Sequence, residues 1–245
     1  MFLLSCRACG LALPLDFRGW RCPSCGKALK LTSDEAFHNL DGIIWKGRTG
    51  MWRYSGSMPF ADRPITLGEG GTPIIKGEFG GAELHMKLEY MSPTGAFKDR
   101  GASACMTRAA ALGAGSVVED STGNAGVAAS AYAARAGIAA RIYVPADAPT
   151  GKKGLMAALG AEVVQCGSRG EAAARAVSEL RHGELYIGHA WDPFYIEGMK
   201  TAAFEMLEAG AVPDAVIMPV ASGTLLLGLY KGFGELRASG LVEEV

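Results

Sequence analysis

The feature that most constrains the fold is a regular alternation of strand-like and helix-like runs between residues 83 and 238. Apolar or alternating runs predict strands at 83–89, 116–120, 138–145, 161–166, 184–188 and 214–220. Helices are predicted at 97–112, 125–136, 152–159, 169–181, 195–209 and 223–238. Four of these helices are followed by the residue that commonly ends a helix, namely Gly113, Gly137, Gly160 and Gly210. The alternation predicts an α/β fold with a mostly parallel sheet.

The N-terminal region has a different pattern, built on cysteine. Four of the six cysteines form two C-x-x-C pairs: Cys6, Cys9, Cys22 and Cys25. Four thiolates at this spacing satisfy tetrahedral zinc and leave no open position for catalysis, so we predict a structural zinc ribbon. Disulfides or free thiols are the alternatives, and disulfides fit poorly in a chain without a secretion signal. Cys105 and Cys166 stand alone and are expected to be buried as small apolar residues.

These patterns divide the chain into a zinc ribbon at 1–30, a connecting segment at 31–65 and an α/β region at 66–245. The connecting segment contains Trp45, Trp52 and Tyr54 and is expected to pack on the main body. A formal net charge of −1 does not favour nucleic acid or an anionic membrane surface as a partner. The longest uncharged run, 215–230, is interrupted by polar residues and reads as a buried strand, loop and helix. The N-terminus lacks a signal-peptide pattern, so we expect a cytoplasmic protein.

Three loops between predicted strands and helices have the composition of a ligand site, since ligands of parallel sheets bind beyond the carboxyl ends of strands. They are "SPTGAFKDRG" at 92–101, "DSTGNAGVAAS" at 120–130 and "PVASGTLLLG" at 219–228. The second and third place small and hydroxyl residues just before a helix, where backbone N–H groups can hold an anion. Taken singly, each loop is also compatible with an ordinary capped helix.

Lys98 is the unusual residue of the first loop because it lies in the first helical turn, where the helix dipole disfavours a cation. Such a lysine is either simply solvated or held as a neutral amine. A neutral amine is what a Schiff base requires. Pyridoxal phosphate would account for all three loops, because it brings an aldehyde, a phosphate and an amino-acid substrate with a carboxylate.

The same motifs resemble those of threonine synthases and, more broadly, of fold-type II pyridoxal-phosphate enzymes. "SPTGAFKDRG" resembles their lysine motif, "STGNAG" their asparagine loop and "EGGTP" at 69–73 their entry motif. "WRY" at 52–54 and the ribbon resemble a zinc-bearing subgroup. The resemblance implies a three-layer αβα fold with mostly parallel sheets, with a small subdomain at about 114–188 and an incomplete large subdomain from the rest of 66–245. It also implies an amino-acid substrate, and we expect a homodimer.

The resemblance implies a role for each loop residue. Lys98 would bind the cofactor covalently and shuttle protons, and Asn124 would hydrogen-bond the cofactor's 3′-hydroxyl. The cofactor phosphate would be held by Ala221, Ser222, Gly223 and Thr224. The substrate carboxylate would be held by Ser121, Thr122, Gly123 and Ala125. The reaction implied is the conversion of O-phosphohomoserine and water to threonine and phosphate.

The sequence departs from the family pattern at several points. Ala221 and Ser222 stand where many relatives have Gly-Asn, and Ala125 stands where many threonine synthases have threonine. A paralogue acting on another amino acid, such as a cysteate synthase or a Ser/Thr dehydratase, therefore stays open. The family's chain normally continues past "LVEEV", so a truncated, non-catalytic member is a further alternative. Arg100 is either a contact for a substrate anion or the partner of Asp99 or another carboxylate.

Overall fold

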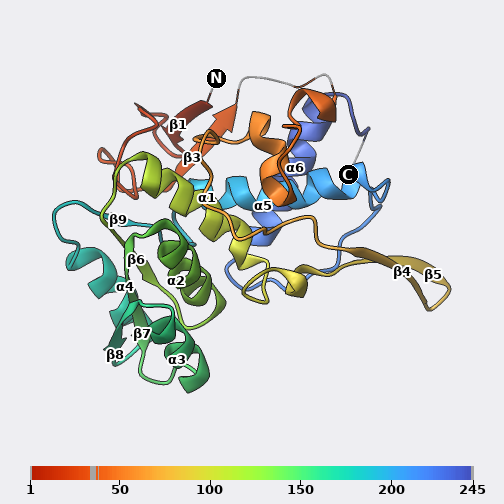
Figure 1. Cartoon of the computed structure of the whole chain (residues 1–245). Helices are drawn as coiled ribbons and strands as arrows, with labels where there is room; N and C mark the ends of the chain where they lie inside the picture. The colour runs from red at the N-terminus through yellow and green to blue at the C-terminus, as the bar shows by residue number, and fades with distance from the viewer. Residues whose placement is uncertain (1, 34–36, 38, 244–245) are drawn as a thin grey trace.

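The computed structural model describes residues 2–33, 37 and 39–243. The strands form three separate sheets along the chain (Figure 1). They are an antiparallel sheet in the order β2-β1-β3, a two-stranded hairpin β4–β5 and a parallel sheet in the order β8-β7-β6-β9. None of the helices within these described ranges is both long and apolar enough to cross a membrane.

The antiparallel sheet is built by the cysteine-rich N-terminal region. Its strands are β1 (Phe2–Cys6), β2 (Ala12–Leu13) and β3 (Leu29–Ser33). Leu4 of β1 pairs with Leu31 of β3, and both side chains are buried. The sheet is tied to the body by Arg18, whose guanidinium donates hydrogen bonds to the carbonyl oxygens of Leu112 and Gly183. The ribbon region therefore rests on the α/β region.

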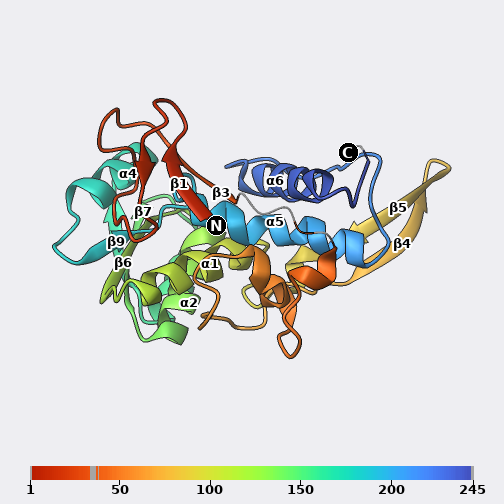
Figure 2. The same ribbon diagram turned by 90° about the horizontal axis from the view of Figure 1, so that it is seen from above.

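The parallel sheet has the strand–helix order that the alternation predicted, which confirms the α/β fold. Its strands are β6 (Ser116–Asp120), β7 (Ala139–Pro145), β8 (Glu162–Cys166) and β9 (Glu184–Tyr186). The helices between them are α2 (Asn124–Ala136), α3 (Thr150–Ala158) and α4 (Arg169–Ser178). α2 and α3 cover one face of the sheet and α4 covers the other (Figures 1 and 2). Because β7 is central and covered on both faces, it is buried from Ala140 to Pro145.

A layer of three helices adjoins this sheet. α1 (Lys98–Ala111), α5 (Pro193–Glu208) and α6 (Thr224–Ala238) lie in the order α1-α5-α6 (Figure 2). α1 and α5 approach closely at Gly198, where an added Cβ would lie 2.0 Å from the carbonyl oxygen of Arg100. α5 begins at Pro193 because the Asp192 carboxylate accepts a hydrogen bond from the Phe194 N–H.

The connecting segment is mostly irregular. It contains the short 3₁₀ helices η1 (Leu40–Gly42) and η2 (Gly50–Ser57), and η3 (Glu89–Met91) follows the hairpin. Trp52 and Tyr54 are buried as expected, whereas Trp45 is half exposed, at 49%. Residues 34–36 and 38 of this segment lie outside the described residues.

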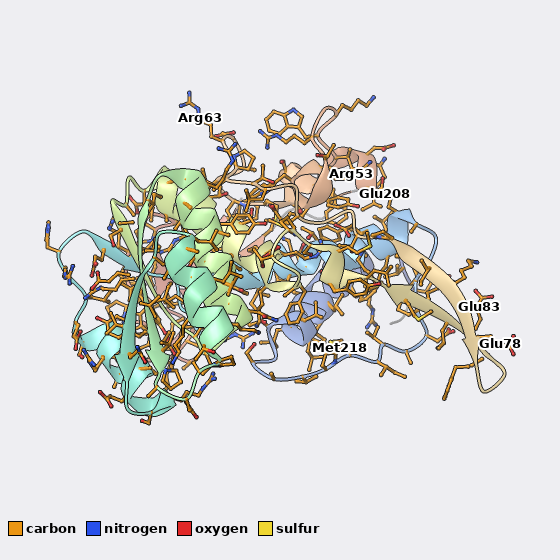
Figure 3. All side chains as sticks on the ribbon, turned by 60° about the horizontal axis from the view of Figure 1, so that its bottom comes forward. Arg53, Arg63, Glu78, Glu83, Glu208 and Met218 are labelled. Atoms are coloured by element: carbon orange, nitrogen blue, oxygen red, sulfur yellow. The ribbon has the colours of Figure 1, made fainter. Side chains whose placement is uncertain are left out.

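Two of the predicted strands differ from the structure. The strand predicted at 83–89 is β5 (Ala82–Lys87), but it pairs antiparallel with β4 (Ile74–Phe79) in a hairpin that projects from the body (Figures 1 and 3). The strand predicted at 214–220 is wrong: this stretch is an irregular segment, and Ile217 is 95% exposed. The reason is physical, because a strand needs a neighbour for its hydrogen bonds and no described strand lies alongside.

Candidate functional site

Lys98 is the first residue of α1, and a rigid turn leads into it. The Thr94 backbone N–H donates to a carboxylate oxygen of Asp99 at 2.7 Å, and the Thr94 hydroxyl bonds to the other oxygen. Gly95, between them, has φ 78°, a left-handed conformation that favours glycine. The hydrogen bonds between Thr94 and Asp99 therefore fix the backbone conformation where α1 begins.

The Lys98 amine lies against the loop that precedes α6. Its Nζ donates to the hydroxyls of Ser222 at 2.9 Å and Thr224 at 3.1 Å. The rings of Phe97 and Tyr195 flank the amine, with centroids 4.9 and 5.7 Å from Nζ. The structure thus brings together two of the three loops that the sequence analysis singled out, although 124 residues separate Lys98 from Ser222.

Burial lowers the pKa of Lys98 to about 8, and the carboxylate of Glu119 opposes this shift. The helix dipole was expected to favour the neutral amine, whereas burial lowers the pKa in the structure. The hydrogen-bond partners of the amine within the described residues are neutral hydroxyls. A substantial neutral fraction at physiological pH makes this amine suited to covalent chemistry with an aldehyde.

The loop 221–224 offers hydrogen-bond donors beside Gly223, where the missing side chain leaves room for a ligand. Gly223 has φ 76°, which a side chain would strain, and Thr224 is buried as the first residue of α6. The first turn of a helix leaves backbone N–H groups without intrahelical partners. Two hydroxyls, these N–H groups and a glycine without a side chain are the donor set that a phosphate prefers. Ala221 is exposed and contributes no side-chain donor.

The loop 121–124 follows β6 and leads into α2. The Ser121 hydroxyl accepts a hydrogen bond from the Gly123 N–H at 3.2 Å. Asn124 is the first residue of α2, and its side-chain oxygen accepts from Lys152 Nζ at 2.5 Å. No hydrogen bond between described residues links this loop to Lys98. Thr122 is partly exposed and Ala125 is buried in the first turn of α2.

Arg100 is not available to a substrate. Its guanidinium is fully buried and donates to the carboxylates of Glu89 and Glu205, at 2.7 Å each. Of the options left open for Arg100, the structure selects a carboxylate partner other than Asp99. The Thr201 hydroxyl accepts a further bond at 3.0 Å. Arg100 therefore joins α1, α5 and η3 instead of facing the site.

Sequence reasoning missed three residues near Lys98 because their partners are distant in the chain. The buried carboxylate of Glu119 bonds His189 Nδ1 at 2.6 Å. The Tyr195 ring lies 6.0 Å from the His189 ring, and its hydroxyl donates to the Lys98 carbonyl oxygen at 3.0 Å. Burial raises the pKa of Glu119. In the sequence, the only indication of this group was Glu119, an acidic residue near the end of a predicted apolar strand.

The four paired cysteines converge as predicted. Their sulfur atoms lie within 4.8 Å of one another: Cys6, Cys9, Cys22 and Cys25. Gly10 and Gly26 follow the second cysteine of each pair with φ of 74° and 69°, as a tight knuckle needs. This geometry is compatible with one four-coordinate metal ion.

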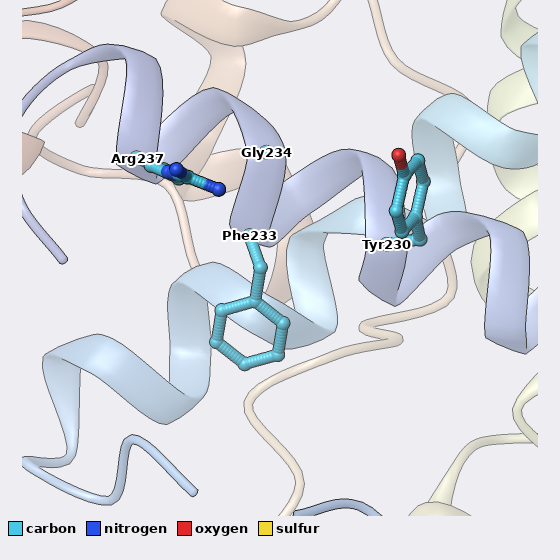
Figure 4. A pocket seen from close by; sticks show the side chains of 4 residues that line it. All are labelled: Tyr230, Phe233, Gly234 and Arg237. Carbon is cyan, nitrogen blue, oxygen red and sulfur yellow. The ribbon is translucent and has the colours of Figure 1, made fainter. Parts of the chain in front are cut away.

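A shallow depression elsewhere on the molecule does not contribute to this site. It is lined by Tyr230, Phe233, Gly234 and Arg237, all on α6 (Figure 4). Lys98 instead meets the opposite, N-terminal end of that helix at Thr224. Within the part of the chain that the structure describes, the lining comes from this one helix, so we assign the depression no role.

Comparison with known proteins agrees with this geometry. Residues 65–243 match the family model described as pyridoxal-phosphate dependent enzyme. The chain is similar to the threonine synthases of Methanosarcina acetivorans (31% identity over all of this chain) and Methanocaldococcus jannaschii (34% identity over 99% of this chain), and it spans 63% of the length of each.

Among solved structures, a pyridoxal 5′-phosphate-dependent aspartate racemase is 31% identical, with a TM-score of 0.61 over 69% of this chain and 55% of that one. The cysteine synthase of Entamoeba histolytica, at 19% identity, has a TM-score of 0.62 over 83% of this chain and 59% of that chain, which indicates the same fold. The motif around Lys98, the loops around it and the family match agree, and the chain belongs to the family of pyridoxal-phosphate dependent enzymes.

Proposed function

We propose that this protein is a pyridoxal-phosphate-dependent threonine synthase, a carbon–oxygen lyase that converts O-phosphohomoserine and water to threonine and phosphate. The observation that carries the proposal is the Lys98 amine, which is held by two hydroxyls and whose pKa is lowered to about 8. The names of the relatives from Methanosarcina acetivorans and Methanocaldococcus jannaschii support the substrate.

The residues present fit the cofactor. An aldehyde needs an unprotonated amine, which Lys98 supplies, and a phosphate needs clustered donors, which Ser222 and Thr224 supply beside Gly223. We assign Ala221 a backbone contact to the same phosphate. The carboxylate of the substrate is assigned to the loop from Ser121 to Ala125, where α2 begins.

In this proposal, the chain's own residues bind, orient and move protons. When bound, pyridoxal phosphate withdraws electrons from the substrate and so eases the breaking of bonds at the α- and β-carbons. The Lys98 amine would take a proton from a substrate carbon and later return one. The Asn124 side chain would hold the cofactor at its 3′-oxygen. Ser121, Thr122 and Gly123 fix the substrate carboxylate and hence its orientation.

Phosphate release from O-phosphohomoserine, measured with the cofactor-loaded protein, tests the function. Because the chain spans 63% of the Methanocaldococcus jannaschii relative, the assay includes the same 245 residues continued by that relative's C-terminal part. Threonine and phosphate formed in equal amounts by either protein support the proposal. Cofactor bound by both proteins, with no threonine from either, contradicts it.

A second candidate is a pyridoxal-phosphate enzyme for another amino acid, such as a cysteate synthase, a Ser/Thr dehydratase or a racemase. The observation that favours it is the 31% identity to the aspartate racemase structure. Ala125, where many threonine synthases have threonine, points the same way. L-aspartate and L-serine tested in parallel with O-phosphohomoserine separate the two candidates. Racemisation or ammonia release without threonine formation would favour the second.

We further propose one structural zinc ion per chain on the four-cysteine cluster. The sulfur geometry supports this site, and metal analysis after expression in zinc-replete medium tests it. A protein containing less than about 0.1 zinc per chain would contradict it.

We also propose the division into a ribbon (1–30), a connecting segment (31–65) and a catalytic region (66–245, with a small subdomain at about 114–188). A homodimer is part of the proposal, and sedimentation at several protein concentrations tests it.

A further inference from the structure

Lys152 meets the candidate cofactor loop from a neighbouring part of the sheet. It lies in the first turn of α3, and its Nζ is 2.5 Å from the side-chain oxygen of Asn124. Its stem passes over Gly123, where an added Cβ would lie 3.3 Å from Nζ and 3.6 Å from Cδ. The missing side chain at Gly123 therefore gives the lysine room to reach Asn124.

The parallel sheet explains why two residues 28 positions apart meet here. β6 and β7 are parallel neighbours, with Asp120 in register with Tyr143. The loops that follow these strands consequently leave the same edge of the sheet. One leads to Asn124 at the start of α2 and the other to Lys152 at the start of α3.

The contact determines which way the Asn124 side chain faces. A carboxamide has one accepting end and one donating end, whereas an ammonium group only donates. Lys152 must therefore take the oxygen of Asn124 and leave the NH2 group for another partner. Among the described residues that NH2 group has no hydrogen-bond partner, and Asn124 is exposed. A donor left in this position suits an anionic oxygen of a ligand.

We propose that Lys152 is a positioning residue, which orients the Asn124 carboxamide so that its NH2 group faces the 3′-oxygen of the cofactor. The inference rests on the proposed cofactor site. Lys152 sits at the N-terminal ends of two helices, where a cation is disfavoured. Lys152 has no carboxylate partner among the described residues. An anionic 3′-oxygen of the cofactor, bound beside Asn124, would offset the unfavourable field of the two helix N-termini.

Lys153 offers a matched control on the same helical turn. Its Nζ donates to the carbonyl oxygen of Ala146 at 2.9 Å and to Gln165 at 3.4 Å, outside the loop that carries Asn124. Lys153→Met therefore removes an equal charge from α3 without touching the Asn124 side chain.

A double-mutant cycle on cofactor affinity tests the proposal. The dissociation constant of pyridoxal phosphate is measured by absorbance titration for the wild type and for five variants: Lys152→Met, Lys152→Arg, Lys153→Met, Asn124→Ala, and the double variant Lys152→Met/Asn124→Ala. We expect Lys152→Met to weaken binding about tenfold. In the Asn124→Ala background the same change should cost less than about twofold, because the partner is gone. Lys152→Arg should restore most of the affinity, and Lys153→Met should match the wild type.

Other outcomes overturn the proposal. Equal losses from Lys152→Met with and without Asn124 would mean that the lysine acts independently of the carboxamide. Unchanged cofactor affinity, with weaker binding of O-phosphohomoserine alone, would make Lys152 a substrate contact instead. A wild type that binds no cofactor contradicts this inference and the proposed function together. Intact coupling without turnover of O-phosphohomoserine contradicts only the proposed substrate.

Discussion

Two cations lie two positions apart on the first turn of α1, in opposite environments. The Lys98 amine is half-buried and contacts the hydroxyls of Ser222 and Thr224. The Arg100 guanidinium is fully buried and bonded to two carboxylates. We call this second set the Arg100 cluster, which consists of Thr72, Glu89, Arg100, Thr201 and Glu205.

The difference separates a candidate reactive group from a structural one. The carboxylates of the Arg100 cluster stabilise the charged guanidinium. Burial alone would raise the pKa of Glu205, but Arg100 and, to a smaller extent, Lys87 hold it down at about 2. Among the described residues no carboxylate bonds to Lys98, and Glu119 acts on it only through its charge, so burial lowers the pKa of Lys98 to about 8. One helical turn thus carries both a candidate catalytic group and an ion cluster that fixes the helix in place.

The largest expected effect follows from removing the reactive amine. Lys98→Ala should abolish covalent attachment of pyridoxal phosphate and lower turnover by on the order of a thousandfold or more. Borohydride reduction followed by peptide mapping measures the attachment. In the wild type the label should be found on Lys98. Labelling of Lys87 or Lys152 instead would show that the wrong lysine has been assigned.

Lys98→Ala should leave folding intact, whereas Arg100→Met should not. Removing the guanidinium leaves the two carboxylates of Glu89 and Glu205 with Lys87 as their remaining cationic partner. One buried negative charge is then uncompensated, which costs about 3–5 kcal/mol of unfolding free energy. Urea denaturation measures the loss. The control is Arg53→Met, because Arg53 pairs with Glu208 at the surface with 39% and 33% of the side chains exposed (Figure 3). That change should cost about 0–1 kcal/mol, and equal losses in both variants would contradict the assigned role of the cluster.

The pH dependence of cofactor attachment sharpens the same comparison. Only the neutral amine reacts, so the neutral fraction of Lys98 should grow as the pH rises through about 8. At pH 6 roughly one hundredth of the amine is neutral, against about half at pH 8. Stopped-flow absorbance between pH 6 and 10 measures the attachment rate. A midpoint near the ordinary lysine value would show that burial does not tune this amine.

The smallest expected effect concerns Glu119, whose negative charge opposes the lowering of the Lys98 pKa. Glu119→Gln removes this charge, so the midpoint of cofactor attachment should move to lower pH, by no more than about one unit. The change keeps the size of the side chain, and the hydrogen bond to His189 can be retained by the amide. An unchanged midpoint would mean that Glu119 is protonated in the wild type, and a shift to higher pH would mean that it acts through another group.

Much of the fold was predictable because it rests on local patterns. The strands β6, β7, β8 and β9 and the helices between them lie close to their predicted positions. The predicted helix at 169–181 ends earlier, at Ser178, and the predicted strand at 214–220 does not form. Periodicity marks a segment that can be a strand, but the hydrogen bonds of a strand come from a neighbour that the segment itself does not specify.

The candidate site was predictable in composition but not in contacts. The motif identified Lys98, and the glycines and hydroxyls identified the loops at 121–124 and 221–224. The sequence did not indicate Lys152, because a lysine after a proline-containing turn resembles any solvated surface lysine. Its role depends on the register of β6 and β7, which places two helix starts side by side.

The sequence by itself determined the local features of this protein: the cysteine knuckles, the order of strands and helices, and the turn that begins α1 with Lys98. These features depend on backbone preferences and side chains a few residues apart. Only the tertiary structure decided which of the two cations is the candidate reactive group. Lys98 meets Ser222 across 124 residues, and Arg100 meets Glu205 across 105. Protonation and pairing depend on burial and on partners in three dimensions, and neither can be read from the order of residues.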